Sequence, residues 1–330
     1  MAEPLRTALL GCGAIASAYR AALARVPELR LVAVVDPIAT ARERLAAGDT
    51  SIARCADLDG LPAIDAALVL TPPSSHEPLA TALLQRGVHV LCEKPLAPTR
   101  EAAERMLAAA RAANRRLMMG SKFRYTPDVA GARALLDDGL CGDVVIYENV
   151  FCSHVPMAGR WNADPAIAGG GVLVDNGCHS VDLARYLLGP LARIQAQFGR
   201  RIQPLPVEDT ARMLFASDGG ALGSIDLSWS IHKESPAYVR IHGTAGTIEI
   251  GWRESRYKRR DDADWRVFGR GYDKVAAFTA QLVNFAGVVA GRELPVIDDA
   301  DALASVVLVE CAYRSAREER WISVPALSRA

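Results

Sequence analysis

The first part of the chain alternates between short apolar runs and stretches in which apolar residues recur at helical spacing. This alternation is typical of a doubly wound parallel sheet, in which helices connect strands that are buried on both faces. The expected strands lie within 5–11, 29–36, 65–71, 87–93 and 115–121, and the expected helices within 14–26, 39–47, 76–87 and 100–114.

After Ser121 the pattern changes to longer runs that alternate or stay apolar, within 143–153, 209–229 and 237–252. Glycine-rich turn signals interrupt the last two runs, which predicts antiparallel strands. We therefore expect two domains: an α/β domain of the doubly wound Rossmann type over 1–122, and an α+β domain with a large, mostly antiparallel open-faced sheet over 123–330. A helix at about 299–318 is expected to pack on this sheet and back toward the first domain.

The charge balance narrows the range of partners. The 330 residues contain 38 Lys and Arg against 38 Asp and Glu, and the isoelectric point is about 7.0. Such a neutral chain argues against nucleic acid or an anionic membrane as the main partner. The one basic cluster, 256–260, is followed directly by acidic residues, and we interpret it as a solvated loop.

Cysteine use and hydropathy bear on the compartment. The seven cysteines form no C-x-x-C pair, which favours a reducing compartment over a disulfide framework, and no zinc-ligand spacing occurs, so no metal is expected. Because no apolar run reaches the length needed to span a bilayer, no membrane segment is expected. The sequence therefore predicts a cytoplasmic protein.

A glycine-rich motif lies where the first expected strand meets the first expected helix. Residues 11–16 read Gly-Cys-Gly-Ala-Ile-Ala, a G-x-G-x-x-A fingerprint. Glycines at such a turn let the backbone approach a pyrophosphate, which then lies at the helix N-terminus. We therefore predict that Gly11, Gly13, Ala14 and Ile15 bind a dinucleotide.

The second expected strand ends in Asp36. A carboxylate at this place can accept hydrogen bonds from the adenosine ribose hydroxyls and repels a 2′-phosphate. The next residue is Pro37, so no adjacent Arg or Ser favours that phosphate. NAD is the expected cofactor, with NADP less favoured.

Two further loops, 71–78 and 92–98, follow expected strands at the edge where ligands of open parallel sheets bind. The second contains Lys94, one of only five lysines in a chain whose other cationic side chains are arginines. An ammonium can change protonation, whereas a guanidinium cannot, so we single out Lys94 as a candidate for chemistry.

A third candidate site follows three consecutive glycines in the second half of the chain. Read as a helix, residues 169–189 bury Leu183, Tyr186 and Leu187 and place Asp175 and His179 one turn apart on one face. Two interpretations stay open from these residues alone: the start of a core helix, or a carboxylate and an imidazole held together for proton transfer.

These motifs together resemble the glucose–fructose oxidoreductase, inositol dehydrogenase and MocA (Gfo/Idh/MocA) family. The matching segments include GCGAIA, TPPSSHEPLA, CEKPLA, GTAGTIEI and the pattern G-G-G-x-L-x-D-x-G-x-H-x-x-D at 169–182, in family order along nearly the whole chain. The resemblance implies a Rossmann domain at 1–122 followed by a substrate-binding and oligomerisation domain at 123–330, whose open sheet forms homodimer or homotetramer contacts.

The resemblance also implies which residues carry the chemistry. In dehydrogenases of this family, the positions of Lys94, Asp175 and His179 converge beside the nicotinamide and touch substrate. His179 would act as general base, since its unperturbed pKa lies near 6.5. Lys94 would polarise the substrate oxygen and stabilise developing alkoxide, and Asp175 would orient the imidazole or relay its proton.

Other positions are assigned with alternatives. His76 is read either as cofactor-lining or as a helix-start residue, and Trp161 as cofactor-lining or as a core aromatic. Asp182 is interpreted as structural. The segment 122–127 departs from the pattern common in relatives, yet Lys122 and Arg124 remain candidates for substrate binding. The predicted cofactor-lining residues outside the fingerprint are Thr71, Pro72, His76, Glu93, Lys94 and Trp161.

We therefore expect an NAD-dependent dehydrogenase that oxidises a secondary hydroxyl of a sugar, sugar nucleotide, aminoglycoside or cyclitol to a ketone. Three alternatives remain: an NAD(P)H-dependent keto-sugar or imine reductase, a non-catalytic NAD-binding regulator, and an NAD-dependent glycosidase. Asp36 argues against the first, and the intact Lys94, Asp175 and His179 argue against the second. A stable ketone product would exclude the third.

Overall fold

The computed structural model describes residues 3–233 and 235–326. By its internal contacts the chain divides into two units: Met1–Tyr125 with Lys274–Leu303, and Thr126–Asp273 with Ala304–Ala330. The first boundary lies close to the predicted one at 122. The segment Lys274–Leu303 belongs to the first unit, whereas the predicted division places it in the second domain. Sequence patterns did not indicate this, because the contacts that hold the segment join residues far apart in the sequence.

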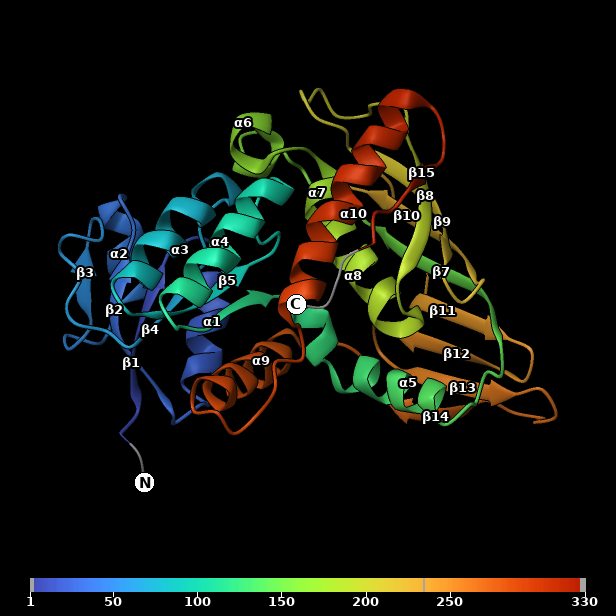
Figure 1. The fold of residues 1–330 in the computed structure, drawn as a ribbon, viewed down its shortest axis with the longest axis horizontal. Helices are drawn as coiled ribbons and strands as arrows, with labels where there is room; N and C mark the ends of the chain where they lie inside the picture. Colours follow the sequence, from blue (N-terminus) through green and yellow to red (C-terminus); the bar gives the residue numbers. More distant parts are fainter. Residues whose placement is uncertain (1–2, 234, 327–330) are drawn as a thin grey trace. The chain divides into compact units, whose positions relative to one another are not determined.

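The first unit contains a six-stranded parallel sheet with strand order β3-β2-β1-β4-β5-β6 (Figure 1). This order places the carboxyl ends of β1, β4 and β5 next to one another, where loops can form a ligand site. The strands are β1 (Leu5–Leu10), β2 (Leu29–Val35), β3 (Ala53–Cys55), β4 (Ala66–Val69), β5 (His89–Glu93) and β6 (Leu117–Gly120).

One face of this sheet packs against α1 (Ala16–Leu23) and α9 (Lys274–Val289). The buried core on this face joins Leu9 and Leu91 of the strands to Tyr19 of α1 and Phe278 of α9, whose ring centroids are 4.2 Å apart. The unit's other helices are α2 (Ala39–Leu45), α3 (His76–Gln85) and α4 (Arg100–Ala112), with the 3-10 turns η1 (Pro73–Ser75) and η2 (Lys122–Tyr125).

The second unit is built on a nine-stranded sheet with strand order β14-β13-β12-β11-β7-β10-β9-β8-β15. Strands β7 and β10 pair in parallel, and the other pairings between described strands are antiparallel. The strands are β7 (Val144–Cys152), β8 (Leu191–Phe198), β9 (Thr210–Ser217), β10 (Leu222–Ser228), β11 (Ala237–Gly243), β12 (Gly246–Gly251), β13 (Ser255–Arg259), β14 (Arg266–Gly269) and β15 (Ile322–Ser323).

The helices α5 (Pro127–Asp137), α7 (Val172–Asp175) and α8 (Gly177–Leu188) contact one face of this sheet (Figure 1). Strand residues on that face, such as Tyr147 and Phe215, are buried. The other face carries Leu214 and Leu222, which are 42% and 52% exposed. The remaining elements are η3 (Trp161–Ala163), α6 (Pro165–Ala168) and α10 (Asp299–Glu318).

The basic cluster at 256–260 is not the solvated loop that the sequence predicts, because most of it lies in β13. Arg256 lies in register with Glu249 of the neighbouring strand β12, and its guanidinium Nε lies 2.8 Å from the Glu249 carboxylate. A partner on the neighbouring strand therefore makes a basic segment compatible with a sheet.

None of the helices in 3–233 and 235–326 is long and apolar enough to cross a membrane.

Candidate active site

The fingerprint turn connects β1 to α1 at the carboxyl edge of the first sheet. Gly11 has a φ of +93°, in the region that favours glycine, and a Cβ there would lie 2.9 Å from the Leu70 carbonyl carbon and the Thr71 nitrogen. At Gly13, by contrast, an added Cβ would meet no described atom within 4 Å. The fold therefore requires Gly11, whereas Gly13 leaves its backbone accessible to a ligand, as does the exposed Ala14 next to it.

This difference predicts opposite outcomes for two matched substitutions. Gly13→Ala should leave the free energy of unfolding nearly unchanged and raise the Kd for NAD⁺ about tenfold, because the new methyl group obstructs a closely approaching pyrophosphate. Gly11→Ala should lower the free energy of unfolding by more than about 1 kcal/mol, because alanine is strained at positive φ. Denaturant unfolding measures the free energy of unfolding of each variant, and NAD⁺ titration measures its Kd. An unstable Gly13→Ala variant would show that the fold also requires glycine at position 13.

Asp36 follows β2 and is held beside the fingerprint turn. Its carboxylate accepts hydrogen bonds from the Cys12 N–H at 2.8 Å and from the Ile38 N–H at 2.9 Å. These two bonds fix the carboxylate next to the glycine-rich turn, which is the place that the ribose of a dinucleotide occupies in such domains.

His76 connects the two further loops of this edge. Its side chain is fully buried, with Nε2 2.8 Å from the Thr71 carbonyl oxygen and Nδ1 2.9 Å from the Pro95 carbonyl oxygen. Burial lowers the pKa of His76, although both carbonyls favour the charged ring. The side chain thus holds the Thr71 loop against the Lys94 loop, while Thr71 and Pro72 themselves are partly accessible.

Glu93, at the end of β5, belongs to a buried polar cluster. Its Oε1 accepts a hydrogen bond from the Tyr19 hydroxyl at 2.6 Å, and that hydroxyl accepts one from Gln281 Nε2 at 2.7 Å. A Cβ on Gly120 would lie 3.1 Å from the Tyr19 hydroxyl, so a glycine at the end of β6 gives the cluster its room. Because Glu93 is only 6% exposed, we assign its carboxylate to this cluster rather than to direct cofactor contact.

Two lysines act electrostatically on this buried carboxyl group. Burial raises the pKa of Glu93, and the Tyr19 hydroxyl and then the ammonium groups of Lys94 and Lys122 oppose that rise. The Lys122 Nζ also lies 5.3 Å from the ring centroid of Phe123. The structure therefore groups two of the chain's five lysines around one acid at this edge of the sheet.

A prediction about pH follows from Glu93. Its pKa is raised in the folded state, so its contribution to the free energy of unfolding is fully present below its unfolded pKa of about 4.3 and is lost as the pH rises through the folded value. Glu93→Gln lacks this titration. The free energy of unfolding of the wild type, relative to that of Glu93→Gln, should therefore fall as the pH is raised above about 4.3. Denaturant unfolding across pH measures this difference. A difference that stays constant or rises with pH would contradict a raised pKa of Glu93 in the folded state.

Arg124 has a structural partner. It is 3% exposed, its Nη1 lies 2.6 Å from the Asp301 carboxylate at the start of α10, and it also contacts the Val296 carbonyl. The guanidinium thus connects η2 to the returning segment of the same unit, a structural role that the sequence does not indicate, and substrate binding by Arg124 stays a prediction.

In the second unit, Asp175 ends α7 and His179 lies in the first turn of α8. The junction residue Asn176 keeps helical backbone angles, and the Ser180 N–H donates to the Asn176 carbonyl, so the two side chains stay one turn apart. His179 is 5% exposed and Asp175 half-buried. Leu183 and Leu187 are buried as expected, whereas Tyr186 is only half-buried because it lies near the end of the helix.

The glycines before this helix are explained by Glu208, which the sequence reasoning missed. Glu208 Oε1 accepts the N–H groups of Gly171 at 3.0 Å and Leu173 at 3.1 Å, and the Tyr313 hydroxyl donates to the same oxygen at 2.6 Å. A Cβ on Gly171 would lie 2.0 Å from the Glu208 backbone oxygen. A Cβ on Gly170 would lie 2.0 Å from the Tyr313 hydroxyl oxygen. The glycines thus let two distant residues fix the start of the helix, and no local signal identifies those residues.

Trp161 begins η3, and its side chain is 43% exposed. This exposure excludes the core-aromatic interpretation and leaves the indole accessible to a ligand.

These features define a class of protein. The strand order, the fingerprint turn and the acid after β2 are those of a dinucleotide-binding domain, and the second unit places Asp175 and His179 one helical turn apart. In the described part of the chain, no cluster of three His, Cys, Asp or Glu side chains is arranged to hold a metal ion.

Comparisons with known proteins support this class. Residues 5–121 match a family model described as an oxidoreductase family with an NAD-binding Rossmann fold, and residues 129–249 match the GFO/IDH/MocA C-terminal domain. The chain is 26% identical to levoglucosan dehydrogenase of Pseudarthrobacter phenanthrenivorans, covering 99% of this chain and 100% of that protein. It is 25% identical to inositol 2-dehydrogenase of Rhizobium meliloti, covering 97% and 99%.

A solved structure of levoglucosan dehydrogenase in complex with NADH superposes with a TM-score of 0.88 at 24% identity, covering 98% of this chain and 99% of that chain. The chain belongs to the Gfo/Idh/MocA family and is an NAD-dependent oxidoreductase acting on CH–OH groups. The expected fold class and cofactor are thereby confirmed.

Proposed function

We propose that this protein oxidises a secondary hydroxyl of a sugar, sugar nucleotide, aminoglycoside or cyclitol to a ketone. The observation that carries the proposal is the position of Lys94 directly after β5, at the same sheet edge as the fingerprint turn and Asp36. An ammonium beside a dinucleotide site can stabilise an alkoxide as hydride leaves the carbon. The relatives named for levoglucosan and inositol support this class of substrate.

The roles of the side chains follow from their chemistry. His179 accepts the hydroxyl proton, Lys94 stabilises the developing alkoxide, and Asp175 orients the imidazole and stabilises its charged form. NAD⁺, when bound, supplies the hydride acceptor. The open backbone at Gly13 and the fixed carboxylate of Asp36 fit that cofactor. Asp182, buried one turn after His179, is assigned a structural role.

A panel of sugars, nucleotide sugars and cyclitols incubated with NAD⁺ tests the proposal. The wild type should form NADH with at least one member of the panel, together with an equal amount of a ketone product. NAD⁺ binding without NADH formation from any member would favour the non-catalytic regulator. Hydrolysis without accumulation of a ketone would favour the glycosidase reaction.

We also propose that the protein self-associates through the exposed face of the nine-stranded sheet, as a homodimer or homotetramer. On this face Ile146, Leu222 and Leu214 lie on the adjacent strands β7, β10 and β9, and each is about two-fifths exposed or more. A cluster of large apolar side chains on a sheet face favours a protein partner.

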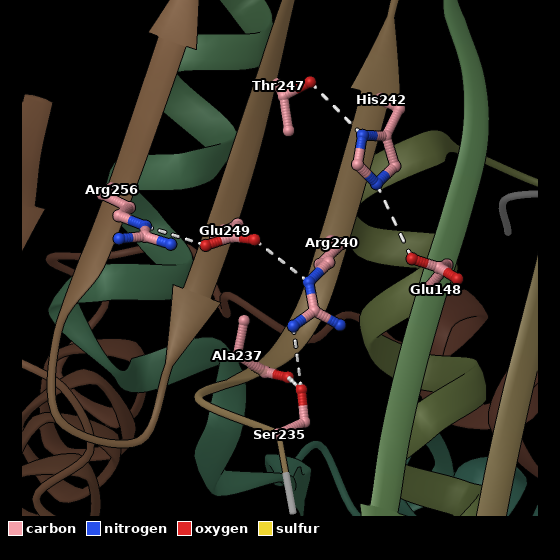
Figure 2. A network of polar contacts seen from close by, with 8 residues as sticks. All are labelled: Glu148, Ser235, Ala237, Arg240, His242, Thr247, Glu249 and Arg256. Atoms are coloured by element: carbon pink, nitrogen blue, oxygen red, sulfur yellow. Dashed lines mark hydrogen bonds and ion pairs between the residues drawn. The ribbon is translucent and has the colours of Figure 1, made fainter. Parts of the chain in front are cut away.

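A row of charged side chains lies on one side of this apolar cluster. Across β7, β11, β12 and β13 the exposed face carries Glu148, Arg240, Glu249 and Arg256 in register, with alternating charge (Figure 2). Glu249 lies 3.0 Å from Arg240 and 2.8 Å from Arg256. A second copy of the chain can place opposite charges against this row of alternating charges. The same row disfavours association of the sheet face with unrelated proteins.

Light scattering at micromolar concentration should show an oligomer for the wild type and a smaller species for Leu222→Glu, because the new charge would be buried in the proposed interface. Leu294→Glu is the matched control: Leu294 is 87% exposed in the first unit, and its replacement should leave the assembly unchanged. A monomeric wild type would contradict the proposed assembly without affecting the proposed reaction.

A further inference from the structure

Three consecutive backbone N–H groups at the start of α7 donate to a single residue, Glu208. Its carboxylate oxygen Oε1 accepts those of Gly171 and Leu173 at 3.0 and 3.1 Å. Its backbone oxygen accepts the N–H of Val172, which lies between them, at 3.0 Å. The first N–H groups of a helix have no partner within that helix, so Glu208, from the loop between β8 and β9, supplies the acceptors that α7 itself lacks.

Tyr313 of α10 contacts the same groups. Its hydroxyl donates to Glu208 Oε1 at 2.6 Å and accepts the Gly171 N–H at 3.2 Å. Its ring lies edge-on against Phe198 of β8, with 5.7 Å between the ring centroids. Burial, and then the Glu208 charge, raise the pKa of the Tyr313 phenol, so the hydroxyl stays protonated and remains a donor.

These contacts matter for α7 because this helix is a single turn. Its four residues end at Asp175, and an isolated helix of this length is not stable in water. The Asp175 N–H donates to the Gly171 carbonyl oxygen at 3.0 Å, so Asp175 lies one turn after the residue that Glu208 and Tyr313 hold. The first turn of α8, which contains His179, follows directly. Contacts at one end of a single turn therefore set the position of the Asp175 carboxylate at its other end.

We propose that Glu208 and Tyr313 are positioning residues for the dehydrogenation, which hold the Asp175 carboxylate where it orients the His179 imidazole. The inference rests on the proposed function, because that function assigns the proton transfer to Asp175 and His179. A misplacement of about 1 Å, caused by a change far from the reacting atoms, can lower a rate by about 10²-fold. The loss of one hydrogen bond at the start of α7 is therefore expected to appear in turnover.

A positioning role and a purely structural role predict different effects on the folded enzyme. A residue that only stabilises the fold changes the free energy of unfolding and leaves the kcat of the folded enzyme unchanged. A positioning residue lowers kcat, and it does so only while the side chain that it positions is present. The two roles can therefore be separated by changing Tyr313 in the presence and in the absence of the Asp175 carboxylate.

Tyr313→Phe removes the hydroxyl and keeps the ring that packs against Phe198. It should lower kcat about tenfold and leave the Kd for NAD⁺ within about twofold. Glu208→Gln keeps a carbonyl oxygen that can accept the same N–H groups, so its loss should be smaller, about threefold. Tyr257→Phe is the matched control: Tyr257 lies on β13 of the same unit, with its ring against Phe268, and its replacement should leave kcat unchanged.

The test is completed by introducing Tyr313→Phe into an Asp175→Ala protein. With the carboxylate absent, the second change should lower kcat by less than about twofold. If Tyr313→Phe does not fold, Glu208→Gln in the same two backgrounds gives the same comparison. An equal loss in both backgrounds would show that the hydroxyl does not act through Asp175, and it would overturn the proposal.

A folded Tyr313→Phe protein with wild-type kcat would also overturn the proposal and assign Glu208 and Tyr313 to the fold alone. In both of these cases the wild type still forms NADH, so the proposed function stands. A wild type that forms NADH with no member of the substrate panel would overturn the proposed function, and this inference with it.

Discussion

Replacing His179 with asparagine is expected to lower kcat by about 10²-fold or more while the Kd for NAD⁺ changes by less than about twofold. Asparagine fits the 5% exposed site and keeps polar atoms, yet it cannot accept the hydroxyl proton. The loss should therefore appear in turnover and not in cofactor binding or folding. Steady-state kinetics with the best substrate of the panel, together with NAD⁺ titration, measure the two effects.

Asp182→Asn provides the comparison for this variant. Asp182 lies one turn further along α8 and is equally buried, but we assign it no part in proton transfer. A thermal melt identifies any variant that fails to fold. A well-folded His179→Asn protein with near-normal kcat would remove the imidazole from the reaction and leave the D-x-x-x-H segment as the start of a core helix.

Lys94→Arg is expected to cause a loss of comparable size, again about 10²-fold in kcat. The substitution keeps the positive charge beside Glu93 but replaces a compact ammonium with a wide planar group that cannot give up its proton. The positive charge beside Glu93 is thus preserved, while the shape of the cationic group at the proposed substrate oxygen is changed.

Lys274→Arg is the matched control, because Lys274 is an exposed lysine at the start of α9. It should leave kcat and NAD⁺ binding unchanged. If Lys94→Arg turns over substrate at the wild-type rate, a positive charge is all that the site requires, and the compact ammonium has no special role.

The strands and helices of the first unit could be predicted because local patterns determine them. Buried parallel strands read as continuous apolar runs, and the turn at Gly11 needs glycine for its positive φ, which a sequence motif can record. The sequence analysis did not predict the β13 strand, because Arg256 is paired with Glu249 on a neighbouring strand and pairing between strands leaves no trace in composition.

The support of the candidate site could not be predicted, because it depends on residues brought together by the fold. Tyr19 and Gln281 come from α1 and α9 and each on its own reads as an ordinary helix residue, and the cofactor-lining role predicted for Glu93 gives no sign of the buried cluster that the three residues form. Glu208 likewise fixes the start of α7 from a distant loop. Motifs single out Lys94, Asp175 and His179 as candidates, whereas the buried residues next to them in the fold required the structure.

The most direct test of the central claim is a double-mutant cycle on kcat with Lys94→Arg, His179→Asn and the combined variant, all saturated with NAD⁺. If both side chains act on the same hydroxyl oxygen, the combined variant should be only slightly slower than the slower single variant. A combined loss equal to the product of the two single losses would mean that the side chains act independently, and it would contradict the account.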